Sequence, residues 1–182
     1  MNILSPLVAN KYVTAIVMLA IVMWSFGFPT WVPFSDAAAL TNVSDTLSDS
    51  DSGVSSDHTI VFTNPTAIAE GDTITITFPG QFNVSTSTAT LALNDFDVAT
   101  TSEYTLAADC TGAERMSVAT SGQTITLTVC AGDGGAIPAN GTTTIEIGTN
   151  ATAAPGSGNN QIINPIAINS YEITIVTSSG IP

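Results

Sequence analysis

The chain offers few side chains that could carry out chemistry, and its single histidine, His58, is the first to consider. A serine hydrolase needs a nucleophile, a base and a group that orients the base. The string nearest to a nucleophile elbow, Thr120-Ser121-Gly122, lacks the Gly-x-Ser-x-Gly frame. His58 opens an alternating apolar run, so we expect it to pack or cap rather than to catalyse. We therefore predict no catalytic residues and no enzymatic activity.

Four aspartates crowd one short region and form the second candidate constellation: Asp45, Asp49, Asp51 and Asp57. Hard oxygen ligands at close spacing suit Ca²⁺. The EF-hand pattern fails, because counting from Asp49 places Gly53 at the fifth position rather than the sixth. We favour a solvated Ser/Asp turn, with a Ca²⁺ site at these residues as the alternative, and we expect no other cofactor.

The only two cysteines, Cys110 and Cys130, are candidates for a disulfide. We predict a hairpin of residues 115–120 and 124–129, turning at Ser121-Gly122-Gln123. The cysteines lie just outside its open ends, where their Cα atoms could reach the roughly 5.5 Å separation that a bridge requires. Two free buried thiols are the alternative. A metal site is disfavoured, because His58 lies far away in the sequence.

Alternating apolar and β-branched residues predict the elements that must position these side chains. We find no helical pattern after residue 39, and the short runs recur at intervals of roughly 10 to 15 residues. About nine such strands indicate an all-β, antiparallel β-sandwich. The predicted strands are 40–47, 58–63, 73–78, 88–93, 103–107, 115–120, 124–129, 142–147 and 171–177, with loops at 48–57, 132–138 and 148–169.

The first 39 residues resemble an export signal. A single Lys11 precedes the apolar run Tyr12–Pro29, and Ala37 to Ala39 offer a small-x-small cleavage site after Ala39. An uncleaved anchor helix is the alternative, because roughly 20 apolar residues suffice to cross a bilayer. Either interpretation places residues 40–182 outside the cytoplasm, as one domain attached to the membrane only through the N-terminal segment.

The charge of the chain narrows the classes of partner. Fifteen acidic residues face two basic ones, a formal net charge of −13. Removing residues 1–39 takes away one charge of each sign, Lys11 and Asp36, so the net charge stays at −13. Binding nucleic acid requires clustered Lys and Arg to displace counterions from phosphate. We therefore predict no nucleic-acid partner and expect cations as the natural small partners.

Three stretches carry a resemblance to a known family. They are LTNVSDTLSDSDSGVSSDHTIVFTNPTAIAEGDTITITFP, IPANGTTTIEIG and NPIAINSYEITIVTSSGIP. Together with the segment between the cysteines, they resemble predicted surface proteins of Patescibacteria-type (candidate phyla radiation) bacteria. Such proteins carry an export signal and one or more immunoglobulin-like sandwich modules. The resemblance implies an immunoglobulin-like fold, a surface location and further modules beyond Pro182, and it transfers no catalytic residue.

These observations predict a non-enzymatic cell-surface or secreted structural or adhesive module. Its expected partners are other cell-envelope or surface proteins and glycans. The alternative is a secreted carbohydrate- or calcium-binding domain. Sugar binding would need exposed aromatic rings, but Trp24 and Trp31 both lie in the export segment. Cleavage would leave only Tyr104 and Tyr171 to stack on a sugar.

Overall fold

The computed structural model describes residues 39–84, 90–152 and 156–179. They all belong to one compact unit, Ser35–Pro182. The expected signal or anchor helix of residues 1–39 lies outside the described residues, except for its last residue.

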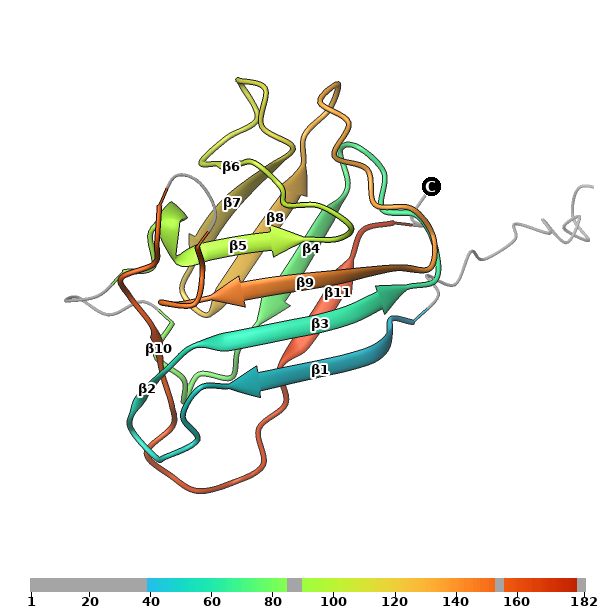
Figure 1. Cartoon of the computed structure of the whole chain (residues 1–182). Coiled ribbons are helices and arrows are strands. Elements are labelled where there is room, and N and C mark those ends of the chain that lie inside the picture. The colour runs from blue at the N-terminus through green and yellow to red at the C-terminus, as the bar shows by residue number, and fades with distance from the viewer. Residues whose placement is uncertain (1–38, 85–89, 153–155, 180–182) are drawn as a thin grey trace, which may run out of the picture. The chain divides into compact units, whose positions relative to one another are not determined.

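Two main sheets are built from the alternating segments (Figure 1). The first has the order β1-β3-β9-β5 and consists of β1 (Thr41–Leu47), β3 (His58–Asn64), β9 (Gly141–Ile147) and β5 (Phe96–Ala99). The second has the order β11-β4-β8-β7-β6 and consists of β11 (Thr174–Thr177), β4 (Thr73–Thr77), β8 (Thr124–Val129), β7 (Met116–Ser121) and β6 (Leu106–Ala107). A small third sheet pairs β10 (Ile162–Ile163) with β2 (Ser55–Ser56).

The core lies between the two main sheets. In β3, every second side chain from His58 to Asn64 is buried, and β8 and β9 repeat this pattern. Ile60 and Phe62 of the first sheet join Ile74 and Leu127 of the second in a single hydrophobic cluster. Because one face of each sheet is apolar, stacking the two faces removes both from water. The arrangement fits a β-sandwich.

Most of the predicted strands are present, and the hairpin is confirmed. Strand β7 pairs with β8 from Met116↔Val129 to Ser121↔Thr124. Gly122 in the connecting turn has a φ of 58°, a left-handed conformation that glycine adopts without steric cost.

The strand predicted at 88–93 is wrong in its described part. Leu91 and Ala92 lie outside any strand, and Leu93–Asp95 form a 3₁₀ turn, η1. The Asp95 carboxylate accepts a hydrogen bond from the backbone N–H of Ala92 (2.7 Å), which favours a turn over an extended chain. A strand that was not predicted begins immediately afterwards, as β5.

The all-antiparallel prediction also needs a correction, because β6 pairs with β7 in parallel. The loop of residues 108–115 brings the chain back in the same direction, and the pairing spans only Leu106↔Met116 and Ala107↔Ser117. The strands predicted at 103–107 and 171–177 are present but shorter than expected, as β6 and β11. In the predicted loop 148–169, Ile162 is buried and β10 pairs with β2.

Candidate functional site

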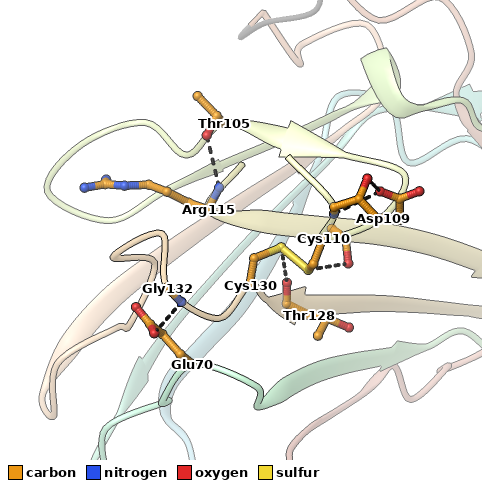
Figure 2. The surroundings of a disulfide bond; sticks show 10 residues. Glu70, Thr105, Asp109, Cys110, Arg115, Thr128, Cys130 and Gly132 are labelled. Atoms are coloured by element: carbon orange, nitrogen blue, oxygen red, sulfur yellow. Dashed lines mark hydrogen bonds between the residues drawn. A yellow bond between two sulfur atoms is a disulfide. The ribbon is translucent and has the colours of Figure 1, made fainter. Parts of the chain in front are cut away.

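The predicted disulfide is present, and it closes the end of the β7–β8 hairpin (Figure 2). The Cα atoms of Cys110 and Cys130 are 5.3 Å apart. The backbone N–H of Cys130 donates to the carbonyl oxygen of Arg115 (3.0 Å), so the bridge lies where the ladder between β7 and β8 ends. The bond links parts of the second sheet and ties the loop after β6 to the end of β8.

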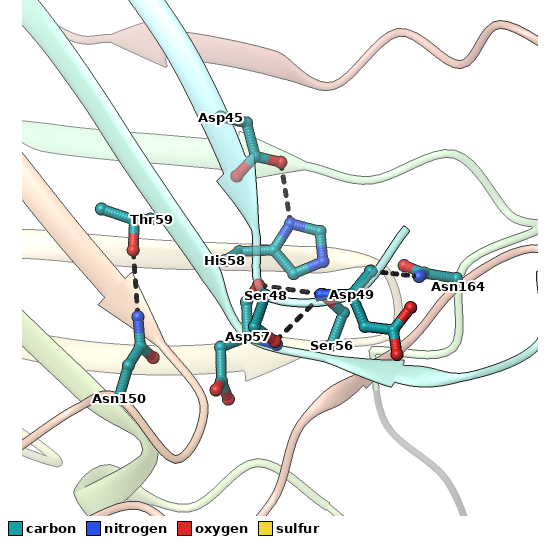
Figure 3. Close-up of polar contacts among 9 residues, drawn as sticks. All are labelled: Asp45, Ser48, Asp49, Ser56, Asp57, His58, Thr59, Asn150 and Asn164. Carbon is teal, nitrogen blue, oxygen red and sulfur yellow. Dashed lines mark hydrogen bonds and ion pairs between the residues drawn. The ribbon is translucent and has the colours of Figure 1, made fainter. Parts of the chain in front are cut away.

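His58 is enclosed in the core. Its side chain is completely buried, and its Nδ1 lies 2.7 Å from Oδ2 of Asp45 on the neighbouring strand β1 (Figure 3). The ring packs edge-on against Phe78 and Phe82, with centroid separations of 5.3 and 6.1 Å. The packing role expected for His58 is confirmed.

The four candidate metal ligands have separate tasks. Asp45 pairs with His58, and Asp49 accepts the backbone N–H of Asp51 in a local turn (2.8 Å). Oδ1 of Asp57 accepts the backbone N–H of Thr149 (2.6 Å) and the side-chain amide of Gln161 (2.8 Å).

The Asp51 carboxylate lies on an exposed loop residue. As the side chains stand, no group of three or more His, Cys, Asp or Glu among the described residues is arranged to hold a metal ion. The four aspartates therefore do not form one cluster.

A completely buried carboxylate that the sequence did not reveal, that of Asp95, accepts four hydrogen bonds. Its oxygens accept the backbone N–H groups of Ala92, Asn159 and Asn160 and the side-chain amide of Asn160, at 2.6 to 2.9 Å. Burial alone would raise the pKa of Asp95, but these hydrogen bonds together lower it below its usual value. Asp95 is thus an ionised anchor for the loop after β9.

A second missed group lies on the outer face of the first sheet, where three carboxylates gather. Asp97 of β5 is the cross-strand partner of Glu146 of β9, and Glu103 follows in the turn after β5. The pKa of Glu103 is raised to about 7, first through its hydrogen bond with Asp97, then through burial and through repulsion by Asp97 and Glu146. Burial, then the charges of Asp97 and Asp57, raise the pKa of Glu146.

Neither of the two tyrosines that could stack on a sugar is fully exposed. Tyr104 is buried, and the Arg115 guanidinium lies 5.3 Å from its ring centroid. Tyr171 is half-buried, packs edge-on against Phe82 and donates its hydroxyl hydrogen to the carbonyl oxygen of Ala167 (2.6 Å). These contacts disfavour carbohydrate stacking at either ring.

A hollow of about 390 Å³ lies between the edge strands β1 and β11. Its walls include Leu47, Phe82, Tyr171, Ile173 and Ile175.

Within the described part of the chain, no helix is both long and apolar enough to span a bilayer. No known protein family matches the sequence, and no curated protein matches it either.

Proposed function

We propose that the chain is a non-enzymatic cell-surface or secreted module with a structural or adhesive role. The observation that carries the proposal is the position of His58, the only histidine of the chain. Its ring is buried, one nitrogen is engaged by Asp45, and two phenylalanines cover it. General acid–base catalysis requires a group within hydrogen-bond reach of the substrate. A histidine in this position stabilises the fold instead.

An immunoglobulin-like architecture is part of the proposal. Two stacked sheets of short strands around one core support it. Two features differ from antibody domains: the disulfide stays within the second sheet, and β6 pairs with β7 in parallel. The proposed likeness therefore concerns the sandwich architecture, as in many cell-surface domains that lack the inter-sheet bridge.

The proposed location is outside the cytoplasm, with the N-terminal segment as the export signal or anchor. The disulfide supports this location, because such bonds persist mainly in oxidising compartments. The net charge of −13 supports a soluble, well-hydrated surface. Partners in this setting would be other envelope or surface proteins and glycans.

Cell fractionation tests the location. Native cells are separated into cytoplasm, envelope and medium, and each fraction is probed with an antibody against residues 40–182. We expect the protein in the envelope or the medium, with an immunoblot for a known cytoplasmic protein as the control for lysis. Recovery mainly from the cytoplasm would overturn the proposal.

A turnover assay tests the absence of enzymatic activity. The purified protein is incubated with ester, peptide and glycoside substrates beside a His58→Gln variant whose fold has been checked by circular dichroism. We expect no turnover above the buffer rate in either protein. Hydrolysis by the wild type that the folded variant lacks would establish an enzyme instead.

A further inference from the structure

The outer face of the first sheet holds three carboxylates that sequence spacing does not connect. Asp97 and Glu146 are directly opposite each other in the antiparallel pair β5–β9. Glu103 is paired with Ala99 through a β-bridge, and Ala99 lies two residues beyond Asp97. Residues two apart in a strand share a face, and so do cross-strand partners. The three acidic side chains therefore belong to one face.

These carboxylates line a shared hollow of about 180 Å³, together with Ala99 and Thr144. A hollow of this size has room for an ion and several water molecules. Its acidic walls come from two adjacent strands and the turn after β5, so most of the site rests on a regular sheet.

Asp97 provides the observation that points to a ligand. Only 6% of its surface is exposed, and although its carboxylate shares a hydrogen bond with Glu103, its buried Oδ1 has no hydrogen-bond partner. A buried charged oxygen without a donor is costly, and native structures normally satisfy such atoms. Asp95, two residues earlier, shows the usual solution, because both of its oxygens accept hydrogen bonds.

Within residues 39–84, 90–152 and 156–179, no side chain supplies the missing positive charge. Arg115, the only Lys or Arg in the chain after Lys11, has its guanidinium beside the Tyr104 ring and donates to the hydroxyl of Ser102 (3.3 Å). Among the described residues, the one ion pair is that of His58 with Asp45, on the opposite edge strand of the sheet. The three carboxylates therefore face one another without a protein cation.

We propose that the carboxylates of Asp97, Glu103 and Glu146 bind a divalent cation, Ca²⁺, in this hollow. Ca²⁺ takes six to eight hard oxygen ligands in flexible geometry, so water completes the shell. Because the side chains as they stand do not surround one point, binding includes a rearrangement of the exposed Glu103 side chain, whose hydrogen bond with Asp97 gives way to the cation. The site deepens the calcium-binding alternative and is independent of the proposed surface role.

Calorimetric titration of the full-length chain in mild detergent, stripped with EDTA and then dialysed free of it, tests the site directly. We expect one Ca²⁺ per chain, with a Kd of about 10⁻⁴ to 10⁻³ M, the range of extracellular calcium modules. Asp97→Asn and Glu146→Gln should each weaken binding at least about tenfold, since each removes one charged ligand. Parallel thermal melts would show whether each variant is folded.

Asp133→Asn and Asp51→Asn are the matched controls, because each also removes one negative charge. Neither residue lines the hollow, and both variants should bind Ca²⁺ as the wild type does. Equal weakening in the controls would mean diffuse attraction to an acidic surface and would overturn the site. Absence of stoichiometric binding, or unchanged binding in folded Asp97→Asn, would overturn it as well. None of these outcomes would affect the location or turnover assays.

Discussion

Two groups of carboxylates in this chain differ in what surrounds them. Asp95, Asp57 and Glu70 each accept at least two N–H hydrogen bonds, whereas Asp97, Glu103 and Glu146 lie together on one face with no cation among them. The first group binds the protein's own loops, and the second lines the hollow that we propose as a cation site. The comparison teaches that the donors within reach, rather than the density of acidic residues in the sequence, separate a structural carboxylate from a candidate ligand.

The loop-binding group acts at both ends of the fold. Glu70 accepts the backbone N–H of Gly132 at 2.8 Å (Figure 2) and that of Gly134 at 3.0 Å, and so fixes the glycine-rich loop after β8. At the other end, Asp95 fixes the loop after β9. The close approach there requires a glycine, because a Cβ on Gly158 would collide with the carbonyl oxygen of Gly148.

The largest effect should follow from removing the completely buried carboxylate of Asp95. Asp95→Ala deletes four hydrogen bonds to a charged, buried acceptor and leaves their donors unpaired. We expect a loss of about 4 kcal/mol in the free energy of unfolding, at the upper end of single substitutions. Urea denaturation measures it, with the milder Asp95→Asn as a second variant.

Asp97→Asn is the contrasting variant, two residues away in the sequence. In EDTA it removes a charge that faces two other carboxylates, so we expect a change within about 0.5 kcal/mol or a gain in stability. The distinction between the two groups would fail if Asp97→Asn lowered the free energy of unfolding as much as Asp95→Ala does. Equal costs would mean that both carboxylates are structural.

Breaking the disulfide should have the next largest effect. The bridge closes a loop across a sequence separation of 20, for which the chain-entropy relation gives about 3 kcal/mol. We expect the double variant Cys110→Ser/Cys130→Ser to melt at a lower temperature than the wild type. Amide hydrogen exchange near Asp95 should become faster only to the extent that the global stability of the fold is lower. A thiol assay on denatured, unreduced wild type should find no free thiol, and two titratable thiols would contradict the bridge.

Much of the fold could be predicted from the sequence, because the central strands β3, β8 and β9 place a buried residue at every second position over most of their length. Ile60, Phe62, Ile125 and Leu127 are examples, and local alternation alone identifies their strands. Strand β5 was missed, since four residues with Asp97 in the middle give too short a pattern. The disulfide was predictable because both cysteines flank a recognisable hairpin.

The two carboxylate groups were beyond sequence reasoning for a different reason. Asn159 and Asn160 donate to Asp95 across 64 and 65 residues, and no local pattern indicates such a pairing. Asp97 and Glu146 meet only through the register of β5 on β9. The sequence instead drew attention to Asp49 and Asp51, which are close in the chain but form only a local turn.

The loss of folding stability at acid pH should depend on the first group of carboxylates, through Asp95. The pKa of Asp95 is lowered in the folded state, so its contribution is present above the unfolded value of 3.8. That contribution is lost as the pH falls through the lower, folded value. Thermal melts below pH 4 should therefore show a steeper loss of stability in the wild type than in Asp95→Asn. An identical loss in both proteins would contradict the ionised anchor.

The second group of carboxylates should make stability change with pH in the opposite direction, near neutral pH, through Glu103. The pKa of Glu103 is raised from 4.5 to about 7 in the folded state, so its contribution to stability is complete below pH 4.5. That contribution is lost as the pH rises through 7. In EDTA we expect the wild type to melt slightly higher at pH 5.5 than at pH 8. Glu103→Gln should reduce this difference in melting temperature between the two pH values. A difference that persists in the variant would mean that another group causes it.

The smallest effect should come from the residues that first suggested a metal site. The Asp49 side chain accepts one backbone N–H within its own loop, from Asp51, so Asp49→Ala should cost at most about 1 kcal/mol. Its backbone carbonyl, which accepts the Asn164 side-chain amide (2.8 Å), stays in place in that variant. Calcium titration should give the same stoichiometry and Kd for Asp49→Ala as for the wild type, because a carboxylate used in a local turn adds nothing to a site on another face. A tenfold loss of affinity in this variant, with Asp97→Asn unaffected, would reverse the assignment of the two groups and place the cation in the aspartate-rich loop.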